Sequence, residues 1–135
     1  PFDAAEAASM RMHPQFGAEI LKHIPHLRDI MPGMLHHHER VDGLGYPAGL
    51  KDEEIPLTAR IISVADTYDA MTTTRPYRKG RPPEEAVREI RRCAGRQFDI
   101  NVVKAFIRAF RKGDIDGTLR QRTGRAASAR NYDLV

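Results

Sequence analysis

The chain has 135 residues, of which 41% are apolar, and its formal net charge is +4. This length suits one domain with a single hydrophobic core and is too short for two. Its apolar runs fall short of the roughly 20 residues that span a bilayer, it shows no secretory leader, and its single cysteine excludes an internal disulfide. The sequence therefore predicts a cytoplasmic globular protein without membrane contact, whose positive charge favours anionic ligands.

Helical periodicity dominates the chain from its first residues onward. Asp3 and Glu6 have capping-box spacing at the first predicted helix, and Pro14 and Pro25 bound the second. The third predicted helix runs over residues 29–40.

A loop rich in glycine and proline follows at residues 42–56, and a fourth helix is predicted over 57–74. The fifth begins at Pro82 and Pro83, with the acids Glu84 and Glu85 in its first turn. The sixth begins at Asp99 as N-cap and ends at Gly113. Because no segment alternates like a strand, the prediction is an all-α bundle of about six helices.

The helical domain is predicted to span residues 1–113. Residues 114–135 are basic and rich in Ala, Ser, Gly and Arg, which predicts a flexible C-terminal tail. A nucleic-acid binder is an alternative suggested by the charge. The absence of a recognition-helix signature and of aromatic residues among the basic ones argues against it.

Residues 36–49 read "HHHERVDGLGYPAG" and hold three of the six histidines. Neutral imidazoles bind zinc, iron and manganese. On a helix, His37 and His38 would diverge by about 100°, so one ion could not easily take both. Two ions about 3.5–4 Å apart could each take one, whereas surface or capping histidines are the alternative.

Two further groups could complete a metal site. Asp66 and Asp69 lie three residues apart in an otherwise apolar helical segment, where buried acids need cations. His13 precedes Pro14 at a helix junction. A solvated acidic face and a capping histidine are the alternatives.

The segment "TTTRPYRKG" places Arg75, Arg78 and Lys79 within five residues. Arginine binds phosphate with two parallel hydrogen bonds, so this cluster beside a metal site indicates phosphate-ester chemistry. A solvated basic loop is the alternative.

The motifs HHHE, DGLGYP, GLKDEEIP, ARIISVADTYDAMT and RPYRK occur in one order, and together they resemble the HD-GYP family. The resemblance runs from about "MRMHPQFGAEIL" to "QFDINVVKAF". It implies an all-α HD-domain fold and a phosphodiesterase that opens cyclic di-GMP to pGpG and GMP in bacterial signalling. It also implies two or three divalent metal ions, with iron or manganese expected.

Position by position, the resemblance implies that His13, His37, His38 and Asp66 are metal ligands. It places Tyr46, Arg75 and Arg78 around the nucleotide and its phosphates, and it suggests Asp69 as the catalytic residue that orients water. The GYP turn is expected to carry Tyr46 over the histidines.

One departure from the family pattern is an absent His-Asp dipeptide with a following Lys. We therefore expect a domain truncated at its N-terminus, with reduced metal occupancy; degeneration is the alternative. Truncation would leave Ile20, Ile24, Met34 and Leu35 without partners, and an exposed patch permits oligomers.

Two alternatives to the enzyme stay open. A catalytically inactive module could bind partners such as diguanylate cyclase domains and would need no metal. Another HD-superfamily phosphohydrolase could act on a different nucleotide.

Overall fold

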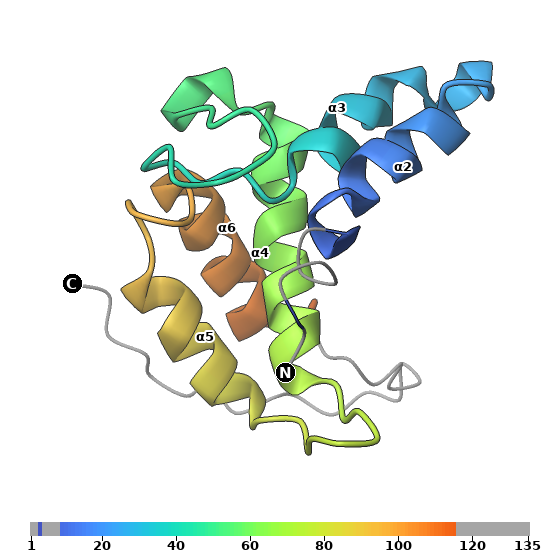
Figure 1. Ribbon diagram of the computed structural model, residues 1–135. Helices are drawn as coiled ribbons and strands as arrows, with labels where there is room; N and C mark the ends of the chain where they lie inside the picture. Colours follow the sequence, from blue (N-terminus) through green and yellow to red (C-terminus); the bar gives the residue numbers. More distant parts are fainter. Residues whose placement is uncertain (1–2, 4–8, 116–135) are drawn as a thin grey trace.

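A computed structural model describes Asp3 and residues 9–115 as helices joined by turns and one long loop (Figure 1). In chain order the elements are α2 (His13–Leu21), the 3-10 helix η1 (Pro25–Ile30), α3 (Met31–His36), the 3-10 helix η2 (Asp52–Glu54), α4 (Leu57–Thr72), α5 (Pro83–Arg92) and α6 (Ile100–Lys112). The described ranges contain two isolated bridges but no strand, so the all-α prediction is confirmed. Most of the first predicted helix and nearly all of the predicted tail lie outside the described residues.

Helix α4 is the central element of the fold. Helix α3 packs on α4 and carries α2, so that α2, η1 and α3 form an arm projecting from α4 (Figure 1). Helices α5 and α6 also pack on α4, on the side away from the arm. The loop after α3 returns to this side, where the Val41 and Asp42 amides donate to the Gln97 and Arg96 carbonyls.

Two apolar clusters hold these elements together. The larger lies between α4, α5 and α6 and consists of buried side chains at helical spacing: Val64, Val87, Ile90, Phe98, Val103 and Ile107. The smaller joins Val41 of the loop to Ile55 and Ala59. Apolar burial contributes roughly 25 cal/mol per Å², and the smaller cluster thereby holds the loop against α4. Both the loop and α4 contribute side chains to the candidate site.

The third helix is shorter than the predicted range of 29–40, because it ends at His36. His37 is its C-cap, and the Glu39 amide donates to the His36 carbonyl at 2.9 Å in the turn that follows. The Glu39 side chain points into the interior, where it accepts hydrogen bonds from loop amides. This inward turn ends the helix before Arg40.

Apolar side chains remain exposed on the arm. Ile20 and Ile24 are 70% and 42% exposed, as the sequence led us to expect, whereas Met34 and Leu35 are half-buried. An apolar groove of about 670 Å³ also lies between α4 and α6. Among the described residues, however, no helix has the length and apolarity to cross a membrane.

Asp99 connects α4 to the start of α6 and is expected to contribute measurably to stability. Its carboxylate accepts hydrogen bonds from the Asn101 and Val102 amides at 2.7 and 2.9 Å and from the Arg60 guanidinium at 2.7 Å. Burial alone would raise the pKa of Asp99, but these donors lower it overall. Asp99→Ala should lower the free energy of unfolding by about 2 kcal/mol in urea denaturation.

Asp99→Asn is the matched control, because it keeps a helix cap and removes the charge. Since the folded-state pKa lies below the unfolded value of about 3.9, the carboxylate stabilises fully above that pH. This contribution is lost as the pH falls through the folded-state pKa. The stability difference between wild type and Asp99→Asn should therefore shrink below about pH 4. Equal stability of all three proteins at pH 7 would contradict the prediction.

Candidate metal and phosphate site

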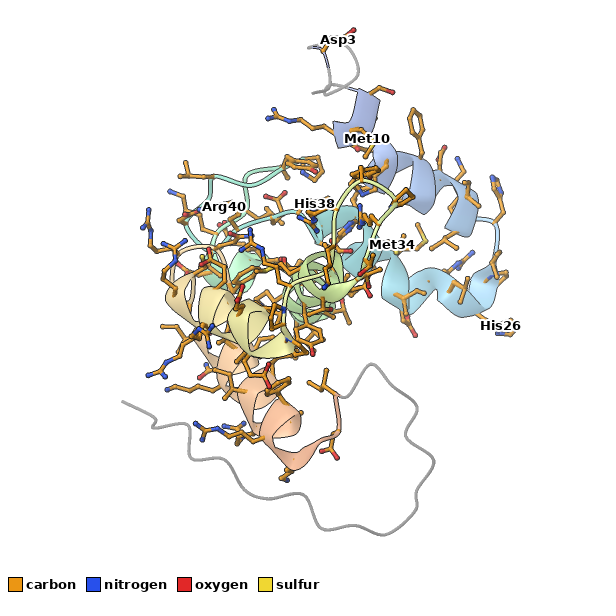
Figure 2. The ribbon with its side chains drawn as sticks, turned by 90° about the horizontal axis from the view of Figure 1, so that it is seen from below. Asp3, Met10, His26, Met34, His38 and Arg40 are labelled. Atoms are coloured by element: carbon orange, nitrogen blue, oxygen red, sulfur yellow. The ribbon has the colours of Figure 1, made fainter. Side chains whose placement is uncertain are left out.

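Three histidine side chains meet where α2 begins and α3 ends. His13 Nε2 lies 3.3 Å from His37 Nε2 and 3.1 Å from His38 Nε2. One nitrogen from each ring lies within 4.8 Å of the other two. Figure 2 shows His38 where the arm meets the rest of the molecule. The structure therefore brings together three of the four predicted metal ligands.

Backbone carbonyls fix the orientation of two of these rings. His13 Nδ1 lies 2.6 Å from the Met10 carbonyl oxygen, and His37 Nδ1 lies 2.6 Å from that of Met34. Because a carbonyl only accepts, each Nδ1 carries the proton and each Nε2 presents a lone pair. Lone pairs facing each other repel unless a cation lies between them.

The nitrogen spacing fits such a cation. Two nitrogens that bind one tetrahedral metal ion at about 2.0–2.1 Å lie about 3.3 Å from each other. The Nε2 atoms of His37 and His38 lie 3.3 and 3.1 Å from that of His13. The histidine cluster could therefore hold a divalent metal ion.

The prediction that adjacent His37 and His38 diverge is wrong. Their ring centroids are 4.1 Å apart with an interplanar angle of 42°. Helix α3 ends at His36, and the two rings lie close together just beyond this end. A single ion can thus contact both rings.

His38 is in the protonation state that metal binding needs. Burial, followed by the neighbouring His37 and His13, lowers its pKa to about 4, and Asp66 partly opposes this shift. The ring is therefore neutral at pH 7, with a lone pair available to a metal.

A hollow of about 270 Å³ opens beside the cluster, and we call it the histidine hollow. Its lining includes Arg11, His37, His38, Tyr46 and Asp66. Asp66 faces the hollow, but the group of ligand atoms that lie within 4.8 Å of one another consists of histidine nitrogens and does not include its carboxylate oxygens. It therefore lies at the rim of the histidine cluster.

Asp69 does not line the histidine hollow. Its carboxylate instead accepts the Thr73 hydroxyl at 2.9 Å, near the end of α4. Both Asp66 and Asp69 are exposed, so the expectation of buried acids is wrong. The buried face of α4 is formed by Ala59 and Val64.

The GYP turn lies against the histidines. The Tyr46 ring stacks on the His38 ring with centroids 4.8 Å apart and an interplanar angle of 19°. The Tyr46 backbone amide also donates a hydrogen bond to the His38 carbonyl at 3.2 Å. Gly45 makes this approach feasible, since a Cβ there would lie 2.4 Å from the Glu39 Cα and 2.5 Å from the Arg40 nitrogen.

Glu39 holds the turn in place, a role that the sequence analysis did not assign. Its fully buried carboxylate accepts hydrogen bonds from the Ala48 amide at 2.6 Å and the Leu50 amide at 3.1 Å. The only sequence signal was an acid directly after the histidines in the HHHE motif.

Glu39→Gln is expected to lower the free energy of unfolding by about 1–2 kcal/mol, because the amide group can accept only one of the two loop N–H groups well. Urea denaturation measures the effect. Glu53→Gln, on the exposed 3-10 helix η2, is the matched control and should have no measurable effect. An unchanged unfolding midpoint for Glu39→Gln would show that the buried carboxylate does not hold the turn.

Arg75 and Arg78 lie beyond the end of α4 and do not line the histidine hollow. Their backbones pair with each other in a tight turn, and the Arg78 guanidinium donates to the Ala70 carbonyl. The end of α4 is six residues from Asp66, which corresponds to about 9 Å along a helix. The structure thus does not bring these two arginines to the histidine cluster.

Comparison with known proteins identifies the family. A model of the HD domain matches residues 2–102. A cyclic di-GMP phosphodiesterase of Pseudomonas aeruginosa is 41% identical over 121 residues, covering 89% of this chain and 29% of the relative. One of Thermotoga maritima is 45% identical over 101 residues, covering 73% of this chain and 27% of the relative. The chain therefore spans less than a third of these curated relatives.

A solved structure supports the fold. An HDG"Y"P protein of Bdellovibrio bacteriovorus superposes with a TM-score of 0.63 at 20% identity, covering 81% of this chain and 34% of that one. The helical fold is that of an HD domain. The chain belongs to the HD-domain family and is of the HD-GYP type, which confirms the resemblance seen in its motifs.

Proposed function

We propose that the chain forms the metal- and phosphate-binding part of a phosphodiesterase that hydrolyses cyclic di-GMP to pGpG and GMP. The observation that carries this proposal is the cluster of His13, His37 and His38 nitrogens beneath Tyr46. The names of the relatives in P. aeruginosa and T. maritima support the substrate.

His13, His37 and His38 would hold the metal, with Asp66 at the rim of the site. A mixed nitrogen and oxygen ligand set suits iron or manganese, and we propose two or three ions in a complete centre. Bound ions would act as Lewis acids on the phosphate and lower the pKa of bound water to about 7. With the ligands of this chain alone, we expect reduced occupancy.

The remaining residues are assigned from their resemblance to the HD-GYP motifs, and of these only Tyr46 lines the histidine hollow. Tyr46 offers a flat ring above His38 for positioning the nucleotide. Arg75 and Arg78, beyond the end of α4, would bind phosphate at some distance from the metal. Asp69 would orient water, and it lies one turn after Asp66 on the same helix.

The test loads the chain with Mn²⁺, or with Fe²⁺ in the absence of oxygen, and measures metal content, cyclic di-GMP binding and product formation by chromatography. Metal-dependent binding of cyclic di-GMP that His38→Ala and Asp66→Ala abolish is expected, with little pGpG formation by this chain alone because part of the metal centre is missing. Unchanged binding and product formation in both variants would refute the assignment. A metal-free chain that binds a diguanylate cyclase domain would favour the inactive docking module.

A further inference from the structure

We propose that Arg11 is the cation that binds the substrate phosphate held at the histidine cluster, while Arg75 and Arg78 serve the second phosphate of the cyclic dinucleotide. This inference rests on the proposed function. It assigns a role to a residue that neither the motifs nor the family resemblance singled out.

Arg11 shares the histidine hollow with the candidate ligands. It precedes His13 by two residues and lines the hollow together with His38 and Asp66. Its guanidinium carbon lies 5.8 Å from the centroid of the Tyr46 ring. The same ring stacks on His38 with centroids 4.8 Å apart, so Tyr46 is a common neighbour of Arg11 and the cluster.

The other cation of the hollow is already paired. Arg40 donates to both carboxylate oxygens of Asp42 at 2.9 and 2.6 Å. For Arg11, the described residues provide no hydrogen bond or ion pair and only the ring contact. Among the described residues, none therefore engages its five N–H donors, which can point to an anion in the hollow.

The chemistry of arginine suits a phosphate at this position. A guanidinium binds two phosphate oxygens through parallel hydrogen bonds, and an aromatic face beside it supports the cation. A cyclic dinucleotide carries two phosphodiesters. One can lie near the metal and Arg11 while the other reaches the turn at 75–78, which lies beyond the end of α4.

The division of roles predicts different effects on ligands with one and two phosphate groups. Calorimetry with the Mn²⁺-loaded chain would measure binding of GMP and of cyclic di-GMP. Arg11→Gln should weaken both by on the order of 10- to 100-fold, and Arg11→Lys should restore part of the loss. Arg75→Gln and Arg78→Gln should weaken cyclic di-GMP alone. Arg28→Gln, on the exposed surface of η1, is the matched control and should change neither.

The Mn²⁺ affinity of each variant shows whether the inference about Arg11 or the proposed function is wrong. If Arg11→Gln weakens Mn²⁺ and nucleotide equally, Arg11 positions His13 and does not bind phosphate, so the inference is wrong. If GMP binding is unchanged in Arg11→Gln but lost in His37→Ala, the inference is wrong and the proposed function stands. If the Mn²⁺-loaded chain binds neither nucleotide, the proposed function fails and this inference fails with it.

Discussion

His37→Ala is expected to lower the affinity of the chain for a divalent metal by more than about 100-fold. Even residues that only support metal ligands change affinity by 10–100-fold, and His37 supplies one of the three clustered nitrogens. His37 is 8% exposed, and the Met34 carbonyl fixes its ring, so its Nε2 is pre-positioned. The remaining pair, His13 and His38, would form a weaker site with two ligands.

Zn²⁺ is the probe for this prediction, because it binds imidazole more tightly than Mn²⁺ or Fe²⁺. Competition with a chromogenic chelator gives the affinity, and far-UV circular dichroism checks the helices. His26→Ala is the matched control, since Figure 2 shows His26 at the far end of the arm from His38. An affinity for His37→Ala within threefold of wild type would mean that the cluster is not the metal site.

Gly45→Ala is expected to lower the free energy of unfolding by about 3 kcal/mol and to displace Tyr46 from His38. The added Cβ would lie 2.4 Å from the Glu39 Cα, 2.5 Å from the Arg40 nitrogen and 2.6 Å from the His38 carbonyl oxygen. All three atoms belong to the backbone, so no side-chain rotation relieves the overlap, and overpacking of this kind costs about 1–3 kcal/mol or more.

Gly49→Ala, in the same loop, separates this overlap from backbone strain. Gly49 has a φ of +69°, but the nearest atom to an added Cβ is 3.7 Å away. Gly49→Ala should therefore lower the free energy of unfolding by only about 1 kcal/mol, which is the strain of an alanine with a left-handed backbone. Urea denaturation measures stability, and cyclic di-GMP binding reports on the loop. A smaller loss of stability for Gly45→Ala than for Gly49→Ala would show that the turn can move away from residues 38–40.

Several helix ends could be predicted because they depend on local chemistry. Asp99 caps α6 with its own carboxylate, and Gly113 ends it with a φ of +78°. Pro83 begins α5, and α4 follows Pro56. The residues that decide each of these ends lie within a few positions of it, so the sequence displays them directly.

The end of α3 could not be predicted in this way. It depends on Glu39 turning inward to bind the Ala48 and Leu50 amides. Those partners lie nine and eleven residues further along the chain and come into place only when the loop closes. Helical periodicity continues past His36 in the sequence, so the predicted helix runs on to Arg40.

The sequence by itself determined the all-α class, most helix ends and the chemical types of the ligands, because capping and periodicity are local properties. The tertiary structure alone decided how the side chains of the candidate site come together. It brings His13 to His38 across 25 residues and sets Arg11 beside Tyr46. Backbone carbonyls that accept hydrogen bonds from the Nδ1 atoms of His13 and His37 direct the Nε2 atoms of both rings inward. These contacts depend on how the arm packs on α4 and how the loop folds back, and neither arrangement is encoded in any short stretch of residues.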